Sequence, residues 1–110
     1  MKFVININQF SPNTKEVDLT EKEVDYIMML ASGVNKDRIT EILIINDVEI
    51  ENLYLKFGLT NTKRIRDNQL ATVVASNSLL NAEVLTSVYN KYKLEELKSM
   101  IDFIKNLKSC

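Results

Sequence analysis

Residues 20–33 read TEKEVDYIMMLASG and predict the first helix of a helical fold. Thr20 and Glu23 form a capping box, in which the threonine side chain accepts an amide proton from the first turn and the glutamate side chain accepts the N–H of the cap residue. Apolar residues then follow at spacings of three and four, so that one face of the helix carries Val24, Ile27, Met28 and Ala31. Gly33 lies where a residue with left-handed backbone geometry ends a helix. This stretch therefore predicts both ends of a helix and its buried face.

The residues after this helix predict two more short helices and then a fourth. Asn35 can cap the second helix, and either Asn46 or Asp47 can cap the third, which ends before Gly58. The fourth helix is predicted over residues 66–75. The predicted inward-facing residues of these helices are Ile39, Ile42, Leu43, Ile50, Leu53, Tyr54, Phe57, Leu70, Val73 and Val74. Three short helices joined by tight polar turns are typical of a helix-turn-helix domain.

The N-terminal residues carry a different pattern. Residues 2–10 alternate between polar and apolar side chains and predict a short extended arm, which is broken at Pro12. Because a lone strand cannot complete its own hydrogen bonding, an ordered arm needs a pairing partner, for example the same arm of a second molecule. The alternative is that the arm is a disordered leader.

Residues 79–91 and 93–108 predict two further helices. The second of them carries a seam of apolar residues at alternating spacings of three and four, namely Leu94, Leu97, Ile101 and Ile104. Two heptads of this kind can form a short coiled coil with a second chain, which makes these four residues candidates for a dimer interface. The alternative is that the helix packs on the preceding helices of its own chain. One apolar helix can serve both purposes, and we expect a homodimer.

The scarcity of three residue types excludes several classes of function. The chain has no histidine, a single cysteine at Cys110 and only two glycines. Histidine-based catalysis, histidine or cysteine metal sites, internal disulfides and glycine-rich phosphate-binding loops are therefore excluded. We expect neither an enzyme nor a protein that holds a cofactor or metal. The longest apolar stretch, residues 26–31, is far shorter than the roughly 20 residues that span a membrane, and no signal pattern opens the chain, so the expected location is cytoplasmic.

Charge is unevenly distributed along the chain, although the net charge is only −1, from 14 basic and 15 acidic residues. Residues 41–51 contain four acids and no base, whereas residues 56–66 contain four bases and no acid. Such runs are either solvated faces of alternating charge or a local basic patch on a weakly acidic protein.

Residues 19–45 resemble the start of the LuxR-type (GerE) helix-turn-helix domain, and the similarity continues more weakly to about residue 75. The third helix lacks the threonine and histidine of the family pattern, and the turn after it comes about one helical turn early. The motifs that carry the resemblance are, in chain order, Leu19-Thr20 with Glu23, Met29-Leu30-Ala31-Ser32-Gly33, Asn35-Lys36 followed one residue late by Ile39, Lys56-Phe57-Gly58-Leu59, and Arg66.

The resemblance implies a transcriptional regulator whose third helix enters the major groove of double-stranded DNA, while basic residues at the helix ends contact phosphates. It makes the third-helix positions Asn46, Glu49 and Asn52 candidates for base contacts. The candidates for phosphate contacts are Lys36, Lys56, Lys63, Arg64 and Arg66.

The charge of the third helix favours a second hypothesis. A helix in the major groove brings Arg, Lys, Asn or Gln to the base edges, whereas this one carries Asp47, Glu49 and Glu51, and acids close to phosphates reduce affinity. The alternative is a protein-interaction module, an adaptor or antagonist of another regulatory protein, that retains the scaffold without DNA binding.

Together these patterns predict an all-α protein in three parts. An N-terminal arm covers residues 1–18, a LuxR-like helix-turn-helix domain of four helices covers residues 19–76, and a helical extension covers residues 77–110. The expected function is that of a small, dimeric, DNA-binding transcriptional regulator, with the protein-interaction module as the alternative.

Overall fold

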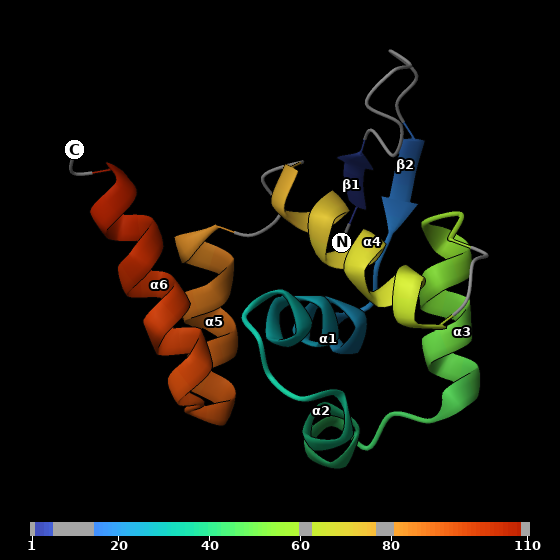
Figure 1. Cartoon of the computed structure of the whole chain (residues 1–110), viewed down its shortest axis with the longest axis horizontal. Helices are drawn as coiled ribbons and strands as arrows, with labels where there is room; N and C mark the ends of the chain where they lie inside the picture. The colour runs from blue at the N-terminus through green and yellow to red at the C-terminus, as the bar shows by residue number, and fades with distance from the viewer. Residues whose placement is uncertain (1, 6–14, 60–62, 77–80, 109–110) are drawn as a thin grey trace.

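The fold consists of six helices and one short β-hairpin in the part of the chain that the structure describes (Figure 1). The computed structural model describes residues 2–5, 15–59, 63–76 and 81–108. Two strands come first, β1 (Lys2–Ile5) and β2 (Lys15–Asp18). The helices are α1 (Glu21–Ala31), α2 (Lys36–Leu43), α3 (Asp47–Lys56), α4 (Lys63–Ser76), α5 (Ala82–Tyr92) and α6 (Glu95–Lys108). The predicted all-α class is confirmed, with the hairpin as an addition.

Local hydrogen bonds set both ends of α1 as the sequence predicts. The Thr20 side chain accepts the N–H of Glu23 at 3.2 Å, and the Glu23 carboxylate accepts the N–H of Thr20 at 2.9 Å. Gly33 follows the helix with a φ of 91°, a left-handed value that glycine adopts without a steric penalty. The capping box is therefore confirmed.

Asparagine side chains cap the next two helices. Asn35 accepts the N–H of Asp37 at the start of α2, and Asn46 accepts the N–H of Glu49 at the start of α3, both at 2.9 Å. Of the two predicted caps for α3, the structure uses Asn46. Gly58, with a φ of 71°, ends the turn after α3.

Helix α1 lies at the centre of the molecule, and the other helices surround it (Figure 1). It contacts α2, α4, α5 and α6. The predicted single buried face is therefore too narrow, because Tyr26 and Met29 are as fully buried as Ile27. Ala31, which the pattern places inward, is only half-buried. A helix covered on several sides buries more than one stripe of side chains.

The N-terminal arm pairs with a later segment of the same chain. Strand β1 runs antiparallel to β2, with Lys2 opposite Asp18 and Ile5 opposite Lys15. The prediction that an ordered arm needs a pairing partner is confirmed for these four residues, and the partner is β2 of the same chain rather than a second molecule. Val17 of β2 and Leu19 directly after it are buried, so the hairpin is anchored to the helices through its second strand.

The two C-terminal helices belong to the same core as the rest of the chain. Leu97 is completely buried, and Leu94 and Ile101 are each only 7% exposed, because α6 packs on α5 and α1. This burial contradicts the prediction that these three residues face a second chain. Ile104, the fourth predicted interface residue, is half-buried at the edge of the core.

An ion-pair cluster ties α5 to the central helix. The Lys91 ammonium lies 2.8 Å from Glu21 and 2.8 Å from Asp25, and the hydroxyl of Tyr92 donates to Asp25 at 2.9 Å. Asp25 is buried, so the cluster satisfies a carboxylate that has little access to water.

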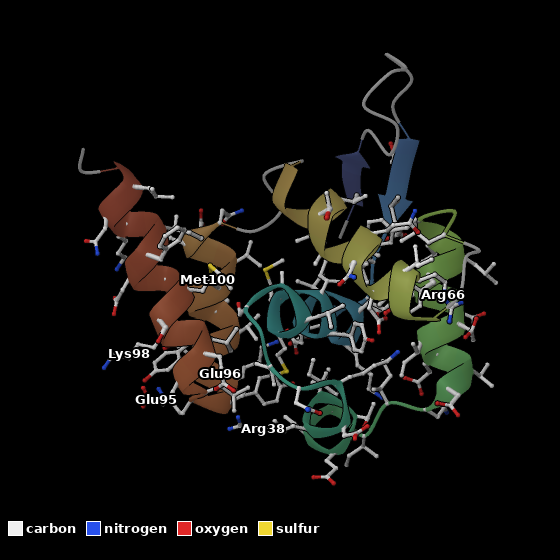
Figure 2. The ribbon with its side chains drawn as sticks, in the orientation of Figure 1. Arg38, Arg66, Glu95, Glu96, Lys98 and Met100 are labelled. Atoms are coloured by element: carbon white, nitrogen blue, oxygen red, sulfur yellow. The ribbon has the colours of Figure 1, made fainter. Side chains whose placement is uncertain are left out.

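A second ion pair ties α6 to α2. Arg38 of α2 points toward Glu96 of α6, at 2.7 Å (Figure 2). Both side chains keep substantial contact with solvent.

The three later helices match the predicted spans with small shifts. The helix predicted over 66–75 runs over Lys63–Ser76, the one over 79–91 runs over Ala82–Tyr92, and the one over 93–108 runs over Glu95–Lys108. No helix in the described ranges is both long enough and apolar enough to cross a bilayer.

Candidate functional site

The outer side of α3 presents apolar side chains to solvent. Ile44, in the turn before α3, is 83% exposed, and Val48 and Leu55 on the helix are 68% and 58% exposed. Val48, Asn52 and Leu55 are spaced by four and three residues, so they share one side of the helix. We call Ile44, Val48, Asn52 and Leu55 the α3 face. Helix α3 itself lies at an edge of the molecule, away from α5 and α6 (Figure 1).

Ile44 has a backbone conformation that its side chain disfavours. It forms the C-cap of α2 at φ 52° and ψ 49°, in the left-handed region. For a β-branched residue this conformation is a steric outlier, and such outliers cluster at functional sites. The fold therefore holds an exposed isoleucine where a glycine or asparagine is the usual residue.

The Lys22 side chain of α1 stabilises the turn at Ile44 through a hydrogen bond. Its ammonium donates to the carbonyl oxygen of Ile44 at 3.3 Å and lies 3.1 Å from the carboxylate of Glu49 on α3. The N–H of Ile44 donates to the carbonyl of Thr40. Both backbone polar groups of the strained residue are thus satisfied.

A groove of about 630 Å³ runs between the start of α1 and α3, beside Asn52 and Leu55. Two ion pairs border it, Lys22 with Glu49 at 3.1 Å and Lys56 with Glu23 at 2.6 Å. The groove is open to solvent and can receive a side chain from outside the chain.

Two of the three predicted base-contact residues are engaged within the chain. Asn46 caps α3, and Glu49 is bound to Lys22. Asn52 is exposed and lies on the α3 face.

The predicted phosphate-contact lysines are also bound to carboxylates of the chain. Lys36 lies 3.3 Å from Asp67, and Lys56 lies 2.6 Å from Glu23. In both pairs the lysine keeps about a third of its side chain exposed.

Arg66 is buried, with 7% of its surface exposed, and binds Glu51 through two nitrogens at 2.7 and 2.8 Å. The predicted phosphate contact at Arg66 therefore requires this ion pair to open, because the two nitrogens are already bound to Glu51. Figure 2 shows Arg66 where α4 approaches α3. Lys63 and Arg64 lie in α4 by their backbone, and their side chains are outside the described residues.

Beneath the α3 face lies a buried polar network that joins α1, α3 and α4. Tyr54 donates its hydroxyl proton to Asp67, and the hydroxyl of Tyr26 lies 3.2 Å from that of Tyr54. The Arg66 guanidinium stacks over the Tyr54 ring at 4.6 Å from its centroid. Burial, followed by the hydrogen bond to Asp67, raises the pKa of Tyr54 well above its ordinary value. Burial raises the pKa of Tyr26 as well.

Three acids of α2 and α3 have no ion-pair partner among the described residues, namely Asp37, Glu41 and Asp47. All three are exposed. The cations of this region, Lys22, Lys36, Arg38, Lys56 and Arg66, are each bound to a carboxylate. Among the side chains that the structure describes on α2 and α3, the charges without an ion-pair partner are therefore negative, and the side chains of Lys63 and Arg64 are not among them.

The chain matches no protein family, no curated protein and no solved structure. The similarity to LuxR-type domains therefore rests on the motifs of the sequence alone. Within the described residues, no group of three or more potential metal-ligating side chains comes together. The α3 face can therefore bind a ligand through its apolar side chains, and carboxylates lie on the same helix.

Proposed function

We propose that this chain is a protein-interaction module that binds a partner protein through the α3 face. The observation that carries the proposal is the exposure of Ile44, Val48 and Leu55 on one edge, with Ile44 held in a strained conformation. Exposed apolar clusters with a polar rim are a common feature of protein-binding surfaces.

The state of the cations supports a protein partner over DNA. Affinity for DNA depends on Lys and Arg side chains that neutralise phosphates and release counterions. Here Arg66 is bound to Glu51 through a side chain that is only 8% exposed, so a phosphate contact requires Arg66 to give up this ion pair. Lys36 and Lys56 must likewise exchange an existing carboxylate for a phosphate.

The chemistry of the face defines the partner. Three exposed apolar side chains require apolar side chains opposite them, and the unpaired Asp37, Glu41 and Asp47 favour Lys or Arg around those apolar residues. An amphipathic segment that carries apolar anchors flanked by basic residues fits this pattern. One of its anchors can enter the groove beside Leu55.

A peptide-display selection on the whole chain tests the proposal. We expect the selected peptides to be rich in apolar residues with Lys or Arg beside them, and to bind Val48→Asp at least about tenfold more weakly than wild type. Ile65→Asp is the matched control, because Ile65 is a half-exposed apolar residue on α4, outside the α3 face. Selected peptides that bind wild type and Val48→Asp equally would contradict the proposal.

Duplex DNA of random sequence at low salt is the competing ligand. We expect no salt-dependent binding by the wild-type chain. If binding is found, and replacing Lys63 and Arg64 with Gln lowers the slope of log affinity against log salt by about 0.9 for each contact, then the DNA-binding hypothesis replaces this one.

A further inference from the structure

Lys22 connects the first turn of α1 to the turn between α2 and α3. Its ammonium donates to the carbonyl oxygen of Ile44 at 3.3 Å and to the carboxylate of Glu49 at 3.1 Å. These two acceptors lie 22 and 27 positions later in the sequence. One side chain therefore fixes Ile44, at the end of α2, against both α1 and the start of α3.

The contact acts on the residue of the α3 face whose backbone is strained. Ile44 lies at φ 52° and ψ 49°, and its side chain is 83% exposed, so side-chain packing does not hold it in this conformation. Backbone bonds close the turn within α2, because the N–H groups of Ile44 and Ile45 both donate to the carbonyl of Thr40. Lys22 adds a bond from a different helix.

The Lys22 contacts contribute little to the stability of the fold. The side chains of Lys22 and Glu49 are 42% and 40% exposed, and an ion pair in such contact with water is worth little. By contrast, Lys56 at the other border of the groove binds Glu23, whose side chain is only 9% exposed. The Lys22 contacts therefore matter more for the position of Ile44 than for folding.

We propose that Lys22 is a positioning residue of the α3 face, which holds the Ile44 turn in the left-handed conformation that presents the isoleucine to a partner. This role rests on the function proposed for that face. Without Lys22 the turn spends part of its time in other conformations. Affinity then falls in proportion to the fraction of chains that present Ile44 correctly.

Charge alone predicts the opposite effect of losing Lys22. The partner inferred above carries Lys or Arg beside its apolar residues, and Lys22 is a cation in the lining of the groove beside the α3 face. Removing this cation takes away the ion pair of Glu49, so the surface attracts a basic segment more strongly. A loss of affinity in a variant without Lys22 therefore identifies positioning and not electrostatic attraction.

Binding of the display-selected peptides tests this sign. We expect Lys22→Met to bind them about threefold to tenfold more weakly than wild type, and Lys22→Arg to bind within about twofold of wild type, because arginine keeps the charge and the N–H donors. Arg38→Met is the matched control, since the exposed ion pair that it removes is made with Glu96 on α6, and it should not weaken binding. Unchanged or tighter binding by Lys22→Met overturns the proposal.

A second measurement needs no partner and separates this role from the proposed function. Amide hydrogen exchange of the full chain, followed by nuclear magnetic resonance, should be about threefold to tenfold faster at Ile44 and Ile45 in Lys22→Met than in wild type. Exchange at Leu53, which is buried in α3, should not change. If no peptide binds wild type, the proposed function fails and the exchange rates alone decide the role of Lys22. Equal exchange at Ile44 and Ile45 in the two proteins overturns that role, whatever the peptides do.

Discussion

At the scale of single residues, Ile44 combines a strained backbone conformation with an exposed side chain. Its left-handed backbone disfavours a β-branched side chain by roughly 1–2 kcal/mol, yet the side chain makes little contact with the fold. The turn is held by hydrogen bonds from Lys22 and to Thr40 instead. Replacing Ile44 by a smaller residue should therefore not lower the stability of the single chain.

We expect Ile44→Gly to raise the free energy of unfolding by about 1 kcal/mol, because relief of the left-handed strain exceeds the roughly 0.5–1 kcal/mol that glycine loses in chain entropy. Urea unfolding followed by circular dichroism measures the change. Val48→Gly is the control, since a glycine inside an exposed stretch of helix destabilises by about 1 kcal/mol relative to alanine. Two changes of the same sign would contradict the assignment of strain to Ile44.

The buried tyrosines predict how stability responds to alkaline pH. The pKa values of Tyr26 and Tyr54 are raised in the folded chain, so the folded state holds their protons above the ordinary tyrosine pKa while the unfolded state releases them. Their contribution is complete below about pH 10 and is lost as the pH rises further. We expect Tyr54→Phe to reduce the slope of unfolding free energy against pH above about pH 10 by up to about 1.4 kcal/mol per pH unit. Equal slopes in wild type and variant, measured by urea unfolding across this range, would refute it.

At the scale of the elements, two ion pairs connect the C-terminal helices to the rest and should differ in strength. Lys91 binds Asp25, whose side chain is only 4% exposed, whereas Arg38 and Glu96 are 49% and 30% exposed. Loss of one member of a buried pair leaves a desolvated charge, while loss of an exposed pair returns both charges to water.

We therefore expect Lys91→Met to lower the free energy of unfolding by about 2 kcal/mol, less than for a fully buried pair because Lys91 is partly solvated and Tyr92 still donates to Asp25. Arg38→Met should cost at most about 1 kcal/mol. Thermal unfolding of the two variants side by side gives the comparison. The idea fails if Arg38→Met is the more harmful change.

The elements differ in how far local sequence predicts them. The starts of α1, α2 and α3 follow from Thr20, Asn35 and Asn46, because a cap bonds to a residue only two or three positions away. Strand β2 pairs with β1, which is separated from it in the sequence by residues 6–14. The residues Lys15–Asp18 carry no local pattern that predicts a strand. The existence and order of the helices could therefore be predicted, whereas the hairpin could not.

The candidate site is predictable only in part, for the same reason. The cap and spacing of α3 identify the segment, but the role of Arg66 depends on Glu51, fifteen positions earlier, and on burial that only the packed helices create. A run of bases in the sequence gives no information about whether each base already has a partner. The exposed Ile44, Val48 and Leu55 leave a usable signal, since all three lie outside the predicted inward-facing set.

At the scale of the whole molecule, one hydrophobic core includes residues from both sides of the boundary that the sequence predicts between residues 76 and 77. The core runs from Val17 to Ile101, and α1 contributes to its contacts with both halves of the chain. Removing α5 and α6 would expose the sides of α1 that they cover. We therefore regard residues 15–108, in their described parts, as one cooperative unit.

This unit predicts a single unfolding transition. Helical circular dichroism and the near-ultraviolet signal of the tyrosines should lose intensity with the same midpoint in urea. Leu97→Ala, in α6, should destabilise by about 2–5 kcal/mol and reduce amide hydrogen-exchange protection in α1 as well as in α5. Loss of protection confined to α5 and α6 would show that the C-terminal pair unfolds on its own.

The left-handed Ile44 turn also has an evolutionary consequence. If only foldedness were under selection, random substitution would replace this isoleucine by glycine or asparagine, since both relieve the backbone. A library of variants sorted for cellular abundance alone should therefore enrich Gly and Asn at position 44, while one sorted for survival of the natural phenotype should retain Ile. A divergence between the two sorted populations at this codon would show that Ile44 is retained for a role other than folding.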